Sequence, residues 1–426
     1  MHLNHPRETN LLKAIAVFLV LLMFSGPAAI ASGTGDTSSD STQVDKNHPN
    51  LQPYETSYSI GHHLLALPSY MLHWVSRPIG WGVIYAETNF PHLFEGERGD
   101  YGIFPLFESG SKVKFAAGAF LFHQHLFREN HEARLQFLYG TDSYLDSSFE
   151  YRVPVSRRYN SSLSFLADYE KNPNQRFFIA ENRQFYSAED ASFGIRYNSS
   201  LSSVVRMQNS IQYRNNTVRS SSSEIIDEEI PLFPDEFKGN YELLTIGSSF
   251  AFDFRRGSSR KVGGSQFIAG ADWINSLKNS TSYLQYHLEY HQFVPIPFLP
   301  ESRRLGLKTK INKAEQLSGS EIPFFDLPTL GGSKNLRGFR NHRFRDEGFW
   351  IVTAEYRYPM WDVLDVTLFM DQGQVFTDFS DIALDKFESS YGFGVHLLSS
   401  KGLAFRVELA FSNEDTRYIL TISPNF

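Results

Sequence analysis

The sequence predicts an all-β protein, and specifically a transmembrane antiparallel β-barrel of about 16 strands. Apolar and polar residues alternate with a period of two from Trp81 to the end of the chain, whereas a helical period is not evident there. The alternating segments are about ten residues long, which is the length of a tilted membrane strand. Aromatic residues make up 15% of the chain and favour strands.

The N-terminus carries the features of an export signal. Arg7 and Lys13 precede an apolar run at 14–24, and Ala29-Ile30-Ala31 fits a cleavage site of small residues. A retained membrane anchor is the alternative, but a spanning helix needs about 20 apolar residues. We therefore interpret residues 1–31 as a signal peptide.

Three further segments follow the predicted cleavage site. Residues 32–53 are rich in Ser, Thr, Asp, Gly and Asn, and such a composition predicts a disordered lead. Residues 54–80 are interpreted as a short periplasmic segment with a possible amphipathic helix. Residues 81–426 form the predicted outer-membrane barrel.

Composition excludes several kinds of chemistry. The formal net charge of -7 argues against a nucleic-acid partner, and the lack of cysteine excludes disulfides and thiol metal sites. No nucleophile and base form a recognisable pair, so we assign no catalytic residue and no cofactor. His123, His125 and His131 have spacing that a metal could use, but we interpret them as turn residues and predict no metal.

Individual segments have one apolar and one polar face. In "GLAFRVELAF", the residues Leu403 to Phe411 with odd numbers are apolar, while Arg406 and Glu408 lie on the opposite face; "DVLDVTLFMD" and "TSYLQYHLEYH" repeat this arrangement. A soluble sandwich would also alternate, but long charged residues on the polar faces favour a wet lumen. Recurring aromatic residues near strand ends are typical of an interfacial girdle. These are Tyr283, Tyr356, Tyr358, Tyr391 and Tyr418.

Sixteen segments alternate or are rich in strand-forming residues. An even number of strands lets the two ends of the sheet meet and removes the unpaired edges that lipid does not tolerate. The predicted strands begin near Trp81, Lys112, His131, Leu145, Tyr159, Asp190, Ser203, Tyr241, Gly263, Thr281, Arg303, Phe349, Asp362, Ser389, Gly402 and Arg417.

The chain ends inside its last predicted strand. In "RYILTISPNF", Tyr418, Leu420, Ile422 and Phe426 share one face. This resembles the C-terminal assembly signal of bacterial outer-membrane barrels, in which an amphipathic strand ends in an aromatic residue. Pro424 cannot donate a ladder hydrogen bond, so we expect a weak seam between the first and last strands.

A long loop, from Ala314 to Gly348, separates the eleventh and twelfth predicted strands, and loops of this length are usually functional or disordered. Its "GGSKNLRGF", followed by "EYRYP" and "FMDQGQVF", resembles the C-terminal half of the BamA and TamA type bacterial surface antigen family, which includes the two-partner secretion transporters. The resemblance implies a sixteen-stranded outer-membrane barrel that inserts or translocates proteins. It also implies that the sixth extracellular loop folds into the lumen. The POTRA domains of that family are not expected here, because few residues precede the first predicted strand.

The resemblance also implies two motifs. The loop motif falls on Arg337, Gly338 and Phe339, and the barrel-wall motif falls on Phe369, Asp371 and Gly373. In the family, the loop arginine pairs with the wall aspartate.

Alternation leads to the same pair by a separate argument. It places Glu355, Arg357, Phe369 and Asp371 on lumen faces of neighbouring strands, where an arginine on a folded-in loop would meet carboxylates. We predict that Arg337 binds Asp371, with Glu355 as the second choice. The other cations of the loop are interpreted as solvated, with lipopolysaccharide phosphates as the alternative partners. They are Lys334, Arg340, Arg343 and Arg345.

These observations favour a barrel that inserts proteins into the outer membrane or translocates them across it. Its predicted partners are outer-membrane lipid, lipopolysaccharide, a client outer-membrane or secreted protein, and a periplasmic protein. The alternatives are a passive channel or structural barrel, and a membrane platform for a periplasmic partner that docks on residues 62–81.

Overall fold

The computed structural model describes residues 100–109, 113–179, 182–221, 233–256, 263–278, 280–295, 303–319, 321–361, 364–398 and 403–424. The predicted signal peptide, the lead, the segment 54–80 and Phe426 lie outside these residues. Among the residues described, no helix is both long and apolar enough to cross a membrane.

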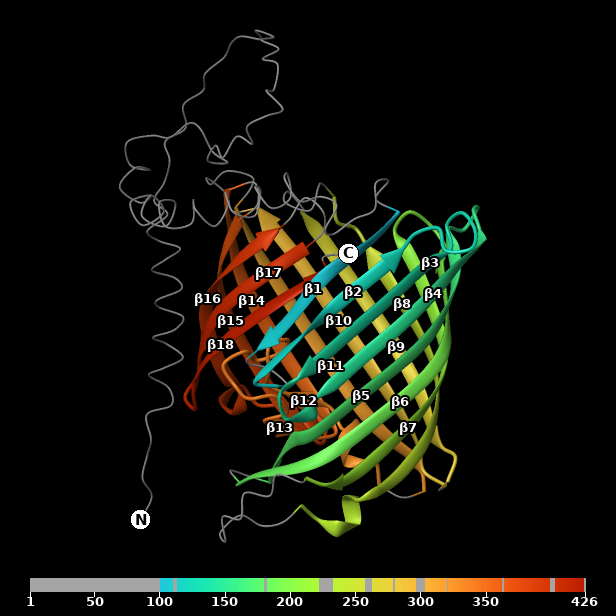
Figure 1. The fold of residues 1–426 in the computed structure, drawn as a ribbon. Helices are drawn as coiled ribbons and strands as arrows, with labels where there is room; N and C mark the ends of the chain where they lie inside the picture. Colours follow the sequence, from blue (N-terminus) through green and yellow to red (C-terminus); the bar gives the residue numbers. More distant parts are fainter. Residues whose placement is uncertain are drawn as a thin grey trace, which may run out of the picture.

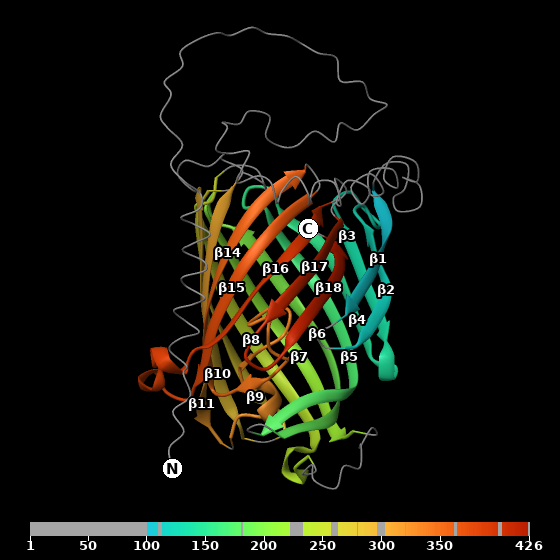
Figure 2. The same cartoon turned by 90° about the vertical axis from the view of Figure 1, so that its left-hand side faces the viewer.

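Sixteen antiparallel strands close into one barrel, as Figures 1 and 2 show. Each strand pairs with its neighbours in sequence, with two exceptions. The first and last strands, β1 and β18, pair to close the barrel, and β11 pairs with β14 because the short strands β12 and β13 belong to the loop between them. The predicted fold class and strand number are therefore confirmed. The wall strands are β1 Tyr101–Ser109, β2 Phe115–His123, β3 Glu132–Gly140, β4 Leu145–Ser156, β5 Ser161–Ile179, β6 Asn182–Ser200, β7 Val205–Ser220, β8 Gly239–Asp253, β9 Gly264–Ser276, β10 Ser282–Pro295, β11 Arg304–Ser318, β14 Gly348–Trp361, β15 Leu364–Phe376, β16 Glu388–Leu398, β17 Leu403–Phe411 and β18 Thr416–Pro424.

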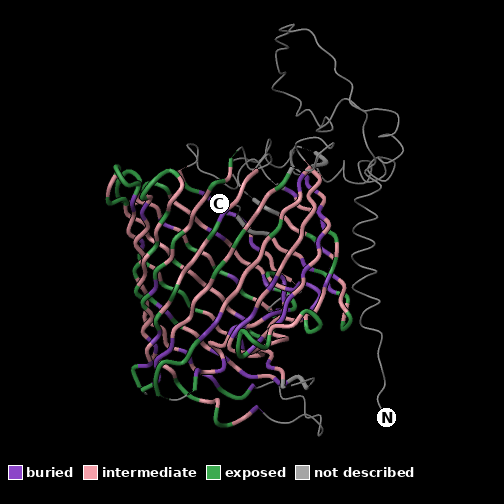
Figure 3. The backbone as a smooth tube through the Cα atoms, turned by 180° about the vertical axis from the view of Figure 1, so that it is seen from behind, coloured by how far each residue is buried: buried purple, intermediate pink, exposed green. Residues whose placement is uncertain are grey.

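The two faces of the wall differ as the alternation predicts. Large apolar side chains on the outer face are exposed, including Phe193 at 62% and Tyr418 at 62%. Polar residues on the inner face of β15 and β17 are buried, and Figure 3 shows buried, intermediate and exposed positions interspersed along the strands. An apolar outer face around a closed sheet is the arrangement that lipid requires.

The first strand was predicted in the wrong place. The strand that pairs with β18 is β1, Tyr101–Ser109, whereas the predicted segment 81–88 lies outside the described residues. Pro105 lies in the middle of β1, and because proline is rare inside strands, the sequence gives little indication of a strand here. The start of the sixth strand was also misplaced, because β6 begins at Asn182 rather than near Asp190.

Two other expectations differ from the structure. The strands β5 and β6 each run for 19 residues, well beyond the ten or so of a membrane span, and extend the wall at the end opposite to the start of β1 (Figure 1). Tyr283 does not belong to an outer girdle, because its side chain is fully buried and its hydroxyl donates to Asp326. Tyr391 and Tyr418 are exposed, as a girdle requires.

Candidate functional site: the lumen loop and its arginine

The loop between β11 and β14, described at residues 319 and 321–347, lies inside the barrel, and we call it the lumen loop. Its contacts reach inward side chains on opposite parts of the wall: Asp326 meets Arg214 of β7, and Arg337 meets Glu408 of β17. Both Figure 1 and Figure 2 show the loop within the outline of the barrel. A segment that touches both parts of the wall must cross the lumen.

The loop turns sharply through two glycines between β12 (Thr329–Leu330) and β13 (Phe344–Arg345). Gly331 and Gly332 both have φ of +106°, which side chains rarely adopt. A Cβ atom on Gly331 would lie 2.2 Å from the carbonyl oxygen of Arg340. The backbone can therefore fold back on itself here only with glycine, and this fold presents Arg337 to the wall.

Arg337 donates three hydrogen bonds to Asp371 of β15. Its Nε donates to Oδ2 at 2.9 Å and its Nη2 to Oδ1 at 2.9 Å, while its backbone N–H donates to Oδ2 at 3.1 Å. The two side chains are 8% and 2% exposed. This is the paired geometry in which a guanidinium binds a carboxylate most strongly, and it is the contact predicted from the sequence.

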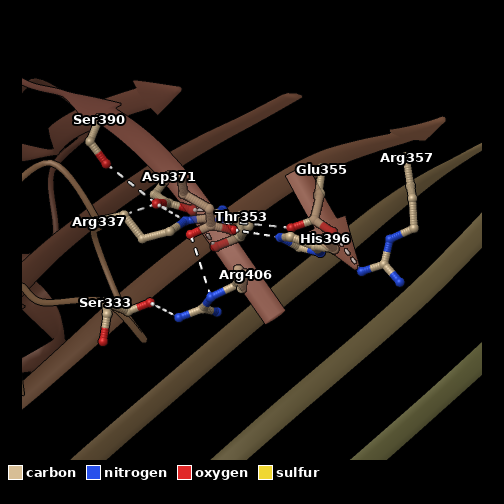
Figure 4. Close-up of polar contacts among 10 residues, drawn as sticks. Ser333, Arg337, Thr353, Glu355, Arg357, Asp371, Ser390, His396 and Arg406 are labelled. Carbon is tan, nitrogen blue, oxygen red and sulfur yellow. Dashed lines mark hydrogen bonds and ion pairs between the residues drawn. The ribbon is translucent and has the colours of Figure 1, made fainter. Parts of the chain in front are cut away.

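Neighbouring strands complete the shell around this pair (Figure 4). Thr353 of β14 and Ser390 of β16 donate to the Asp371 carboxylate at 3.0 and 3.3 Å. The guanidinium carbon of Arg337 lies 3.4 Å from the centre of the Phe369 ring, so the cation also stacks on the aromatic residue of the wall motif. The Asp371 carboxylate and the Phe369 ring therefore hold the guanidinium of Arg337 in place together.

Two glutamates extend the carboxylate set. Arg337 Nη1 lies 3.5 Å from Oε2 of Glu355 and 3.3 Å from Oε1 of Glu408. Glu355 had been predicted as a partner, but Glu408 had not. The position of Glu408 on the polar face of "GLAFRVELAF" is the sequence signal that could have identified it.

Cations of the wall lie against the two glutamates. Arg357 donates to Glu355 at 2.8 Å, Arg406 lies 3.8 Å from Glu408, and His396 contacts the same carboxylate at 3.0 Å. Three guanidiniums thus face three carboxylates, which offsets the cost of burying each charge. Burial disfavours the charge of Arg337, but the carboxylates, above all Asp371, outweigh it and raise the pKa of Arg337 above its ordinary value.

The other motif residues explain why the lumen loop packs so closely against the barrel wall. A Cβ atom on Gly338 would lie 2.7 Å from Cβ of Ser390, and one on Gly373 would lie 2.9 Å from Cδ1 of Leu330. Phe339 is fully buried and packs with Leu330, Leu336, Phe349 and Ile351. Small residues therefore allow close approach, and an apolar cluster supports the charged one from behind.

A second attachment holds the other end of the lumen loop. The Asp326 carboxylate accepts hydrogen bonds from Arg214 of β7 and Tyr283 of β10, and its backbone carbonyl accepts one from Gln285 at 2.9 Å. Nearby, Phe324 packs on Phe177 with ring centres 5.2 Å apart. Sequence analysis did not identify this attachment, because no motif marks it and its partners are far apart in the chain.

The remaining loop cations differ from the solvated interpretation. Arg340 and Arg343 pair with Asp415 and Glu414 in the turn between β17 and β18, at 3.4 and 2.7 Å. Arg345 donates to the carbonyl of Phe324. Lys334 is exposed. Most of the basic stretch is thus neutralised by the protein itself.

The last strand contacts the loop motif directly. Arg417 of β18 donates to the backbone carbonyl of Phe339, and Ser412 donates to that of Gly338 at 2.9 Å. Neither contact was predicted from the sequence. Of the predicted C-terminal signal, Tyr418 faces outward on β18, and Leu420 and Ile422 lie on the same strand at positions of the same parity.

No group of metal-ligating side chains large enough to hold a metal ion is present among the described residues. Of the histidines interpreted as turn residues, His125 bonds within the turn, where its Nδ1 accepts from the backbone of Asn130 at 3.0 Å. His123 is the last residue of β2, and His131 contacts Tyr151 of β4 at 2.7 Å.

Comparison with known proteins supports this architecture. The sequence model of the Omp85 superfamily domain matches residues 126–422. No curated protein matches the chain in sequence. Among solved structures, BamA from Haemophilus ducreyi lacking POTRA domains 1–3 has a TM-score of 0.56 and 14% identity, with 76% of this chain and 70% of that chain covered.

CdiB from Escherichia coli has a TM-score of 0.54 and 8% identity, with 76% of this chain covered. The chain spans 62% of the length of CdiB. At such identities, the likeness to both solved structures concerns the fold.

Proposed function

The chain belongs to the Omp85 superfamily and is a bacterial outer-membrane barrel, and from this premise we propose that it inserts proteins into that membrane or translocates them across it. The observation that carries the proposal is the lumen loop. Its arginine is held by carboxylates from three strands, so the loop and one part of the wall form a single unit. We further propose that residues 1–31 direct export and are removed.

The seam of the barrel supports a wall that opens. Among the described residues, β1 and β18 are paired at three positions, from Phe107 with Ile422 to Ser109 with Leu420. The adjacent pairs β1–β2 and β17–β18 are each joined at nine positions. Since backbone hydrogen bonds join alternate pairs of an antiparallel ladder, the shorter ladder has fewer of them, and this seam separates more readily than its two neighbours.

The loop is joined to the strand at that seam. Arg417 of β18 donates to the carbonyl of Phe339, two residues after Arg337. We propose that the Arg337–Asp371 pair keeps the loop docked, and that the docked loop in turn keeps β18 in place. Opening toward a client would then require only the seam to part, while the rest of the wall stays intact.

The test is proteomics of outer membranes and culture supernatant after depletion of this protein. Cells are rescued with wild type, with Arg337→Ala, or with the matched control Arg340→Ala, whose side chain in the same loop is 37% exposed. We expect selective loss of one or a few surface proteins, restored by wild type and by the control but not by Arg337→Ala. An unchanged profile after depletion would overturn the proposal and favour a passive channel or structural barrel.

A cysteine crosslink tests the seam, and the chain has no native cysteine to interfere. Glu108 and Thr421 are register partners across the seam, and antiparallel partners lie within disulfide distance. The double variant Glu108→Cys/Thr421→Cys should block rescue when oxidised and restore it when reduced. Gln136→Cys/Ser148→Cys, across the fully paired β3 and β4, is the control that should rescue in both states.

A platform for a periplasmic partner predicts a different result. Such a partner would copurify with the barrel and be lost on deletion of residues 62–81, while the oxidised seam variant would still rescue. Rescue by the oxidised seam variant would therefore contradict the opening of the seam.

A further inference from the structure

One end of the barrel carries short turns with exposed arginines. It is the end where β1 begins, at the top of Figure 1, and the lumen loop starts from the opposite end. Outer-membrane barrels have short turns on the periplasmic side and longer loops outside, so this end faces the periplasm. We call its residues 124–131, 157–160, 201–204 and 254–256 the periplasmic rim.

Neighbouring turns of the periplasmic rim are joined through their backbones. The N–H of Ser200 donates to the carbonyl of Tyr159 at 2.8 Å, and the N–H of Asp253 donates to the carbonyl of Val204 at 2.8 Å. These bonds connect the turn before β5, the turn before β7 and the end of β8. The rim is therefore one continuous edge of the wall.

Large apolar side chains are exposed on the outer face of this edge. Phe254 is exposed and has the parity of Phe250, which faces outward on β8. Val155, at the end of β4, is exposed and has the parity of the outward Phe149. The apolar outer face of the wall thus continues up to the rim.

Phe127 is the most exposed of these side chains, at 85%. Its φ of +68° is strained for a bulky residue. Its ring lies edge-on against Tyr151 of β4, with ring centres 6.1 Å apart, and Tyr151 shares the outward parity of Phe149. An exposed ring on a strained backbone gains nothing from water, whereas lipid at the outer face would bury it.

Exposed arginines stand beside these apolar residues. Arg128 directly follows Phe127, and the guanidinium carbon of Arg158 lies 5.4 Å from the centre of the exposed Tyr159 ring. No carboxylate of the described residues forms an ion pair with any of four exposed arginines in the rim. They are Arg128, Arg157, Arg158 and Arg256.

The charge of the rim is therefore largely uncompensated. Its residues include five arginines and one carboxylate, Glu129, and the fifth arginine, Arg255, pairs with Asp253 at 2.7 Å. At the opposite end of the wall, by contrast, Lys238 pairs with Asp235 at 2.5 Å and Lys278 pairs with Glu242 at 3.0 Å. Charge complementarity at the rim thus calls for an anion from outside the protein.

We infer that the periplasmic rim binds anionic phospholipid headgroups of the leaflet that faces the periplasm. The exposed rings enter the acyl boundary, and an arginine two residues beyond a ring, as Arg256 is beyond Phe254, lies about 7 Å farther along the chain, at the level of the phosphates.

Phosphate is the anion that fits these side chains, because a guanidinium binds it through two parallel hydrogen bonds. A zwitterionic headgroup offers the same phosphate, but the arginines repel its ammonium group, so anionic headgroups are preferred. The inference concerns the lipid around the wall and does not depend on client handling.

Binding is tested on the purified full-length barrel in neutral detergent micelles at low ionic strength. Fluorescence anisotropy is measured with phosphatidylglycerol and phosphatidylcholine labelled on the acyl chain. The rim variant is Arg128→Gln/Arg158→Gln/Arg256→Gln. The matched control, Lys238→Gln/Lys278→Gln/Lys386→Gln, removes three cations from the opposite end. Heat-modifiable electrophoretic mobility confirms that each variant is folded, and Arg157→Gln/Arg256→Gln replaces the rim variant if that one is not.

We expect wild type and control to bind phosphatidylglycerol at least about tenfold more tightly than phosphatidylcholine, because each arginine near an anionic headgroup contributes about fivefold in affinity. The rim variant should bind the two lipids alike. An equal preference in the rim variant and in wild type would overturn the inference. So would a wild type without preference, and an acidic segment of a periplasmic protein would then be the partner to test.

Phe127→Gly tests the apolar part of the rim. Glycine adopts the positive φ without strain, so the turn keeps its backbone while the ring is lost. Affinity for both labelled lipids should fall by the same factor, at least about threefold, because the ring contacts acyl chains that both lipids share. Unchanged affinity for both lipids would show that the ring lies outside the lipid and would overturn the placement of the rim at the membrane surface.

Discussion

The two attachments of the lumen loop use charge in opposite ways. At the arginine anchor, a loop cation, Arg337, enters a set of wall carboxylates; at the aspartate anchor, a loop anion, Asp326, meets Arg214 and Tyr283 of the wall. The first pair is 8% and 2% exposed, and the second is 27% and 10% exposed. Because solvent screens the second pair more, the arginine anchor should dominate the stability of the docked loop.

The comparison also separates two kinds of support. The arginine anchor combines charge with close backbone packing at Gly338 and a buried Phe339, whereas the aspartate anchor combines charge with a cluster of aromatic rings around Phe324. A charged contact alone is replaceable, but a contact backed by tight packing tolerates little change. The following predictions test this ranking.

The largest effect is expected from Asp371→Ala. It leaves the Arg337 guanidinium buried without its main partner, which costs about 3–5 kcal/mol. The free energy of unfolding in urea, measured with the barrel in lipid vesicles, should fall by this amount. Combined with Arg337→Ala, the loss should be smaller than the sum of the single losses, because both changes remove one interaction. Simple additivity would show that the pair is not coupled.

Gly338→Ala should be the next most disruptive change. The added methyl group would lie 2.7 Å from Ser390 Cβ and 2.8 Å from the carbonyl oxygen of Phe411, so the loop must move away from the wall. A loss of about 1–3 kcal/mol is expected from such overpacking. Gly263→Ala is the control, since its Cβ would meet nothing within 4 Å. Equal stability of the two variants in the same urea titration would argue against close packing of the loop.

Asp326→Asn should weaken the aspartate anchor by about 1–2 kcal/mol, because hydrogen bonds to a charged group are replaced by neutral ones at a partly exposed site. Protease cleavage within the lumen loop should become faster. The control is Asp235→Asn, whose side chain is 94% exposed. A loss as large as that of Asp371→Ala would reverse the ranking of the two anchors.

Arg340→Ala should have the smallest effect, about 0–1 kcal/mol, because the Arg340–Asp415 pair is exposed on both sides at 37% and 41%. The small loss should disappear at high salt, where exposed ion pairs are screened. A salt-independent loss, measured by urea unfolding at two ionic strengths, would indicate a buried role for this arginine.

Much of the arginine anchor could be predicted from the sequence. Successive side chains point to opposite faces of a strand, so the pattern within each strand places its own acidic residue on the lumen face. These residues are Glu355, Asp371 and Glu408. The motif then identifies Arg337 as their partner. Glu408 could have been added by the same reasoning, because Arg406 and Glu408 share the polar face of β17.

The sequence by itself determined the fold class, the number of strands and the faces of strands such as β15 and β17, because these follow from local alternation. Only the tertiary structure decided which strand closes the barrel and where the far end of the loop attaches. Arg214 and Asp326 are 112 residues apart, and they meet because register and closure bring β7 and the loop together.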